Sequence, residues 1–156
     1  MEKSCLYAGL LDAEYGVKNM VDAFILADIP KCTLHLCGSG PYVDELNNVV
    51  KQHRNIVYHG VMMISDVLNL ERKVSLLINP RPSSGEFTKY SFPSKNMEYM
   101  TSGTPVIANR LPGIPDEYYD HIYVFSGETV EEMAESFKMV FSKPSEALAQ
   151  TGADAY

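Results

Sequence analysis

The sequence has few cations, few cysteines and no long hydrophobic run. Lys and Arg total 13 against 20 Asp and Glu, a net charge of −7 over 156 residues. A general nucleic-acid binder needs a basic face to neutralise phosphates, so this balance argues against that class. No apolar run approaches the roughly 20 residues that cross a bilayer, and we expect no transmembrane segment.

A secretion signal is also lacking. Residues 1–9 contain neither a long apolar stretch nor a small-residue cleavage site. Cys5, Cys32 and Cys37 stand at irregular spacing in apolar runs, which is typical of buried, reduced thiols. These features predict a cytoplasmic protein.

Several catalytic signatures are missing. There is no G-x-x-x-x-G-K-S/T sequence for a P-loop NTPase and no G-x-S-x-G elbow for a hydrolase. The four histidines show no metal-ligand spacing and no partner cysteine pair: His35, His53, His59 and His121. We therefore interpret them as structural or surface residues and expect no metal site.

The sequence does contain enough hydrophobic residues, 46% of 156, to build the core of a single domain. Short apolar runs predict six strands, at residues 5–8, 33–37, 56–58, 74–78, 105–108 and 122–125. Amphipathic stretches between them predict helices that begin near Val17, Val43, Ile64, Pro93 and Val130. Residues 143–156 are small and polar, and we expect them to fray.

This alternation predicts an α/β fold with an open, mostly parallel sheet covered on both faces. Right-handed crossovers place the carboxyl ends of all strands on one edge, where such sheets bind ligands. Gly9, Gly38, Gly60 and the loop from Asn79 all fall on that edge. It is therefore the expected site.

The turn Gly38-Ser39-Gly40-Pro41 follows a strand and opens a helix. A dinucleotide fingerprint requires a third small residue, and Val43 occupies that position. A tight strand-to-helix turn explains the glycines equally well, so a dehydrogenase is a distant alternative.

The stretch from Arg72 to Arg110 carries six basic residues and two acidic ones, a balance of +4, while the rest of the chain is −11. Lys95 falls in the first turn of the helix expected from Pro93, where the helix dipole disfavours a cation. A role in binding a phosphate would explain a lysine at this position, and the alternative is an ordinary solvated lysine. Glu98 lies on the same helix face as Lys95, and its carboxylate can accept hydrogen bonds from two ribose hydroxyls. The alternative is an ion pair between Lys95 and Glu98.

Five segments, in order, resemble the donor domain of GT-B glycosyltransferases of family 4, over about residues 7–141. They are Tyr7-Ala-Gly9 with Tyr15-Gly16-Val17, Leu36-Cys-Gly38-Ser-Gly40-Pro41, Tyr58-His-Gly60-Val61, Leu77-Ile-Asn79-Pro80, and Tyr90-Ser-Phe-Pro-Ser-Lys-Asn-Met-Glu98 followed by Gly103-Thr-Pro-Val-Ile107.

The resemblance implies a Rossmann-like, three-layer α/β/α domain, the nucleotide-sugar-binding half of a retaining enzyme that needs no metal or other cofactor. Its donor is a nucleoside-diphosphate sugar. By position, it assigns donor binding to Gly9 and Gly38 in the glycine turns, Gly60 and Val61 at the base, Pro93, Ser94 and Lys95 around the diphosphate, and Glu98 on the ribose.

Two cations of the family are replaced here. The family usually has an arginine after the glycine matching Gly9 and a lysine before the glycine matching Gly16, whereas this chain has Leu10 and Tyr15. We expect Arg81 and Lys95 to supply the missing charge, as catalytic groups.

The family's paired glutamates are also only half present. The second glutamate of the family matches Glu98, and the first, eight residues earlier, falls on Tyr90. We expect Glu86, in the longer loop, to replace this first glutamate. The pattern resembles a divergent bacterial branch, with surface polysaccharide as the acceptor class.

The family's acceptor groups lie mainly on an N-terminal domain that these residues do not include. We therefore expect the chain alone not to turn over, and to form a homodimer through the apolar face that its partner domain would cover. The full enzyme would work in the cytoplasm, at the inner face of the membrane. The alternative is a non-catalytic nucleotide-sugar-binding or interaction module on the same fold, which the replaced cations favour.

Overall fold

The computed structural model describes residues 2–83, 98–111 and 115–155. A six-stranded sheet runs through its centre, with the strand order β3-β2-β1-β4-β5-β6. The strands are β1 (Lys3–Ala8), β2 (Cys32–Cys37), β3 (Ile56–Tyr58), β4 (Leu76–Asn79), β5 (Val106–Ala108) and β6 (Tyr123–Val124). All five neighbouring pairs are parallel. The six predicted strands are confirmed.

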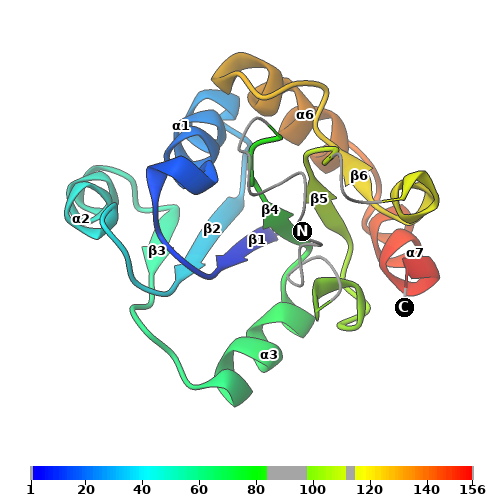
Figure 1. Ribbon diagram of the computed structural model, residues 1–156, viewed down its shortest axis with the longest axis horizontal. Helices are drawn as coiled ribbons and strands as arrows, with labels where there is room; N and C mark the ends of the chain where they lie inside the picture. Colours follow the sequence, from blue (N-terminus) through cyan, green and yellow to red (C-terminus); the bar gives the residue numbers. More distant parts are fainter. Residues whose placement is uncertain (1, 84–97, 112–114, 156) are drawn as a thin grey trace.

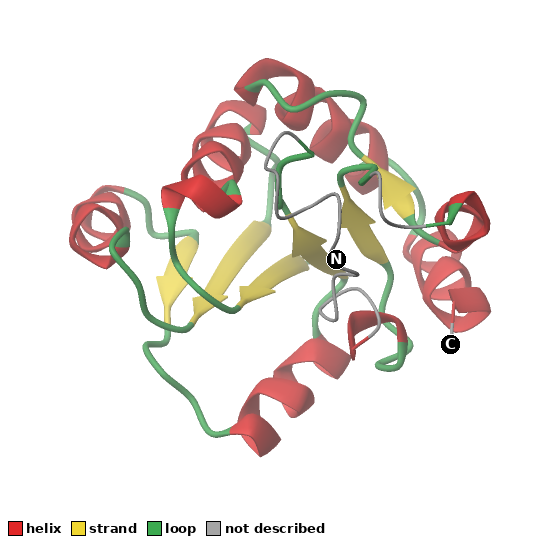
Figure 2. Cartoon of the chain, in the orientation of Figure 1, coloured by secondary structure: helices red, strands yellow, loops and turns green. Residues whose placement is uncertain are grey.

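Helices cover both faces of this sheet (Figures 1 and 2). They are α1 (Val17–Ala27), α2 (Val43–Gln52), α3 (Ile64–Lys73), α6 (Val130–Phe141) and α7 (Ser145–Ala155), with short 3₁₀ segments η1 (Ala13–Tyr15) and η2 (Asp116–His121). In Figure 1, α1 and α6 lie above the sheet and α3 lies below it. The predicted three-layer α/β/α, Rossmann-like architecture is confirmed.

The core has one hydrophobic layer on each face of the sheet because strand side chains alternate in direction. Cys5 and Tyr7 of β1 pack in the layer beneath α1 and α6. Leu6 and Ala8 pack in the opposite layer, with α3. All three cysteines are free and buried, as expected. No helix among the described residues has both the length and the apolar character needed to cross a bilayer.

The C-terminal segment differs from the prediction. Residues 143–156 were expected to fray, but Ser145–Ala155 form α7. Leu148 is buried, and the hydroxyl oxygens of Tyr123 and Thr151 lie 2.9 Å apart. A Cβ on Gly152 would come within 2.2 Å of the Gly103 carbonyl oxygen, so this helix packs through small residues. Such a surface shows no apolar stripe in the sequence.

Candidate functional site

The carboxyl ends of β1, β2 and β3 are joined by backbone hydrogen bonds that glycine N–H groups donate. The Gly9 N–H donates to the Cys37 carbonyl at 3.1 Å, and the Gly38 N–H donates to the Gly60 carbonyl at 2.9 Å. The Tyr58 hydroxyl donates to the Gly38 carbonyl at 2.6 Å. Each of the three loops has a glycine at this point, so that the backbone carries no side chain there along one edge of the sheet.

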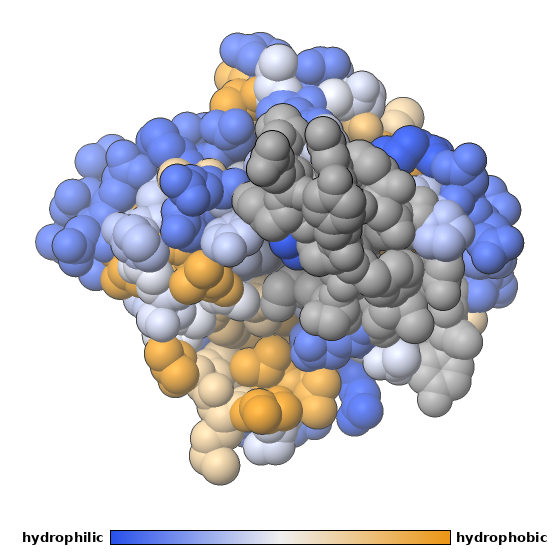
Figure 3. Space-filling view, viewed as in Figure 1, coloured by the Kyte–Doolittle hydropathy of each residue, from blue (hydrophilic) through white to orange (hydrophobic). Residues whose placement is uncertain are grey.

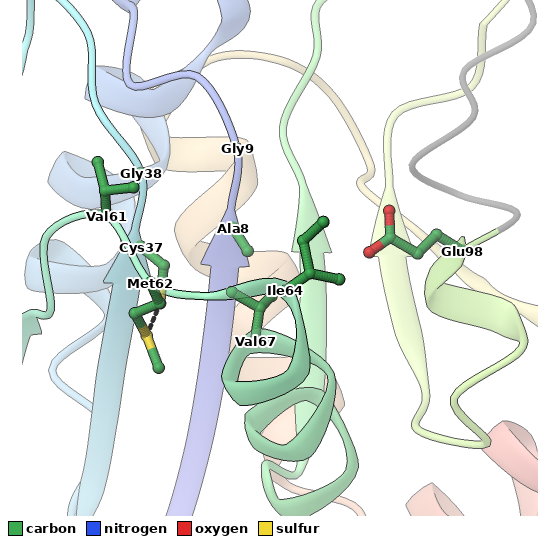
Figure 4. Close-up of a pocket in the computed structure, with 9 residues that line it drawn as sticks. All are labelled: Ala8, Gly9, Cys37, Gly38, Val61, Met62, Ile64, Val67 and Glu98. Carbon is green, nitrogen blue, oxygen red and sulfur yellow. Dashed lines mark hydrogen bonds between the residues drawn. The ribbon is translucent and has the colours of Figure 1, made fainter.

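A pocket of about 200 Å³ lies at this edge (Figure 4). It is lined by Ala8, Gly9, Cys37, Gly38, Val61, Met62, Ile64, Val67 and Glu98. In Figure 4 the Glu98 carboxylate points across the pocket toward Ile64 at the start of α3. Among the described residues, the pocket thus has a glycine-rich floor, an apolar wall and one carboxylate opposite that wall.

The apolar wall comes from the segment between β3 and α3. The Cys37 thiol donates to the Met62 thioether sulfur at 3.1 Å and holds this segment against the end of β2. Burial, with a smaller contribution from Glu71, raises the pKa of Cys37 to about 11. The thiol therefore stays protonated near neutral pH and serves packing rather than nucleophilic chemistry.

Glu98 is positioned by its neighbour in sequence. Tyr99 is fully buried, and its hydroxyl accepts a hydrogen bond from the Ala8 N–H at 3.0 Å. Residues 98–100 are helical, which places the exposed Glu98 carboxylate beside the end of β1. Burial raises the pKa of Tyr99 well above its ordinary value, so the hydroxyl remains a neutral anchor.

Arg81 lies outside this pocket, beyond the end of β4. Its guanidinium carbon is 5.8 Å from the centroid of the Tyr15 ring. Burial raises the pKa of the Tyr7 hydroxyl, Tyr15 adds to the rise, and the charge of Arg81 opposes it. Arg81 therefore places a positive charge next to the ends of β1 and η1.

The predicted site residues fall into three groups. Gly9, Gly38, Val61 and Glu98 line the pocket. Gly60 supports its floor, and Arg81 lies beside Tyr15. The other four lie outside the described residues: Glu86, Pro93, Ser94 and Lys95.

Several residues of this edge were missed by sequence reasoning. Met62, Ile64 and Val67 form the apolar wall. The apolar run Val61-Met62-Met63-Ile64 after Gly60 is a signal that could have identified the first two. The Tyr99 anchor gave no signal, because Tyr99 and Ala8 are 91 residues apart.

Two of the four histidines form a pair. His35 Nδ1 and His59 Nε2 are 2.9 Å apart, and the rings stack with a centroid distance of 5.1 Å. Within the described ranges, no group of three or more His, Cys, Asp or Glu side chains is arranged to hold a metal ion.

A family model described as glycosyl transferases group 1 matches residues 2–143. The chain belongs to this family. No curated protein sequence matches the chain.

Solved structures show the same fold for this glycosyltransferase domain. The C-terminal domain of a Francisella tularensis group 1 family protein, LpcC, is 20% identical with a TM-score of 0.76, covering 99% of this chain and 83% of that one. Anabaena HepE, solved with UDP and glucose, is 18% identical with a TM-score of 0.77, covering 99% of this chain and 42% of that one.

The catalytic domain of the Helicobacter pylori cholesterol-α-glucosyltransferase is 13% identical with a TM-score of 0.75, and 99% and 97% of the two chains are covered. At identities this low, the structural similarity establishes the fold alone, which is that of a GT-B C-terminal domain. The chain spans less than half of the length of HepE.

Proposed function

We propose that the chain binds a nucleoside-diphosphate sugar at the carboxyl edge of the sheet and serves as the donor half of a retaining glycosyltransferase. The supporting observation is the pocket that unites Gly9, Gly38 and Val61 with Glu98. At about 200 Å³ it is smaller than the roughly 300–1,000 Å³ of complete ligand sites. It therefore suits one part of the donor, with the diphosphate and sugar extending along the open edge.

Within this site, Glu98 accepts hydrogen bonds from the ribose hydroxyls. A carboxylate offers two acceptor oxygens and no donors, which matches a pair of neighbouring hydroxyl groups. The base lies toward Gly60 and Val61, where the backbone offers polar groups and the side chains of Val61 and Met62 offer an apolar surface.

Arg81 supplies positive charge to the diphosphate. Its guanidinium lies over Tyr15, at the position where the family resemblance expects a lysine. A cation here stabilises the negative charge that develops on the departing nucleoside diphosphate. Lys95, Pro93 and Ser94 would act beside it, and Glu86 would take the place of the first family glutamate.

Calorimetry with UDP, GDP and their 2′-deoxy forms tests the ribose assignment. We expect one ribonucleotide to bind at millimolar concentration or below and its deoxy form to bind about tenfold more weakly, because a hydrogen bond to a charged acceptor is lost. Glu98→Gln should weaken binding of the ribonucleotide and remove most of the discrimination against the deoxy form.

Glu131→Gln is the matched control, because Glu131 is an exposed acid in the first turn of α6. It should bind as the wild type does. If the folded wild-type chain binds neither UDP nor GDP, the donor site is wrong. If Glu98→Gln keeps full discrimination, the role of Glu98 is wrong.

Leu10 favours a second candidate function. It is 47% exposed at the position where the resemblance expects an arginine. An apolar side chain there suits a non-catalytic binding or interaction module. An upstream reading frame that encodes a second Rossmann-like domain would favour the enzyme. If the enzyme is right, surface polysaccharide is the acceptor class we propose, with no metal required.

A further inference from the structure

The short segment that carries Arg81 is held from two sides. Asn109, 3% exposed at the end of β5, donates from its side-chain amide to the Pro80 carbonyl at 3.1 Å and to the Arg81 carbonyl at 3.0 Å. The Arg81 N–H donates to the Asn79 side chain at 3.4 Å. The backbone on both sides of the Pro80–Arg81 peptide is therefore tied to the sheet.

Glu128 holds the next turn of the same segment. Its carboxylate accepts a hydrogen bond from the Ser83 N–H at 2.9 Å and another from the Ser83 hydroxyl. Glu128 immediately precedes Thr129, which caps α6 by accepting from the Glu132 N–H at 3.1 Å. The Glu128 carboxylate therefore lies directly before the capped N-terminus of α6.

A third contact comes from the other side of the segment. A Cβ on Gly16 would lie 2.1 Å from the Pro80 carbonyl oxygen, so the start of α1 packs directly against this backbone. Gly16, Pro80, Asn109 and Glu128 surround one small pocket. The segment is enclosed by α1, β5 and α6 before the chain continues toward residue 84.

A carboxylate is an unfavourable neighbour for a site that binds an anion, because like charges repel. Its two hydrogen bonds to Ser83 fix the turn that follows Arg81, and this role gives a reason for a carboxylate at that position. We propose that Glu128, together with Asn109, is a positioning residue that holds Arg81 in place for the donor diphosphate. This inference rests on the proposed function and assigns residues that the family resemblance did not.

A double-mutant cycle with Arg81→Ala and Glu128→Ala tests the coupling. Each variant is titrated with UDP and GDP by calorimetry, and the corresponding nucleosides are titrated by NMR. We expect each single change to weaken the better nucleotide about tenfold, since a charge-assisted contact is lost. The double variant should bind no more weakly than Arg81→Ala alone, and nucleoside affinity should not change.

Two further variants separate positioning from general stability. Glu128→Gln keeps one acceptor oxygen and should restore part of the affinity, and Glu131→Ala should match the wild type. Melting temperatures of all variants show whether each is folded. Independent, multiplicative losses in the double variant, or wild-type affinity in Glu128→Ala, would overturn the positioning role. Absence of any nucleotide binding by the wild type would overturn the donor site itself.

Discussion

Gly38 and Gly60 differ in what a side chain would meet at each. Both have positive φ, +127° and +73°. A Cβ on Gly38 would lie 1.9 Å from the Gly9 carbonyl oxygen, whereas one on Gly60 would have no atom within 4 Å. Only Gly38 is required for close contact between two strand ends.

We therefore expect Gly38→Ala to lower the free energy of unfolding by about 2 kcal/mol or more, because strain and steric overlap add. Gly60→Ala should cost about 1 kcal/mol, from its left-handed backbone alone. Urea denaturation followed by circular dichroism measures both. Equal losses would show that the Gly9–Gly38 contact is not as close as described.

At this scale, the sequence predicts residues whose role is local and misses those defined by distant partners. Glycines at strand ends are recognisable because the turn itself requires them. Asn109 and Glu128 are not recognisable, because their partners at positions 80–83 are 28 to 45 residues away. No motif links such pairs before the chain is folded.

Between elements, the His35–His59 pair joins β2 to the end of β3. Burial, and then the neighbouring His59, lower the pKa of His35 below its ordinary value. Because protonation is harder in the folded state, the unfolded chain binds more protons as the pH falls. The stabilisation is complete above about pH 6.5 and is lost as the pH falls from there through the folded pKa of His35.

We expect the free energy of unfolding to fall between pH 7 and pH 5, and to fall less steeply in His35→Gln. Urea titrations at a series of pH values measure this slope. His121→Gln, which removes an exposed histidine at the end of η2, is the control. If both substitutions flatten the slope equally, the pair is not its source.

The elements themselves were predictable to different degrees. Continuous apolar runs identified the buried strands because parallel strands are covered on both faces. The helix α7 was missed because Leu148 is its one large buried side chain among the described positions, while Gly152 packs by having no side chain. Apolar periodicity does not register contacts of that kind.

For the whole molecule, strand and helix alternation was sufficient to predict the parallel sheet and the helices that cover it. It was not sufficient for the exposed surface. Val61, Met63 and Ile64 are 77%, 73% and 79% exposed. Figure 3 shows hydrophobic side chains gathered over α3 and the segment that leads into it. An apolar patch of this kind commonly marks an interaction surface.

We expect the chain, when isolated, to self-associate through this patch at high concentration. Met63→Lys should shift it toward the monomer in multi-angle light scattering. Met139→Lys is the control, because Met139 is 55% exposed on α6, away from the patch. A wild-type chain that stays monomeric at all concentrations would contradict this expectation.

The central claim is that the carboxyl edge of the sheet binds the nucleotide. NMR titration of the isotope-labelled chain with UDP and GDP tests it most directly. The account predicts that backbone shifts concentrate at Gly9, Gly38, Val61 and Glu98. Shifts centred on the pocket at the opposite edge, beside Ser75 and Ala149, or no shifts at millimolar nucleotide, would contradict it.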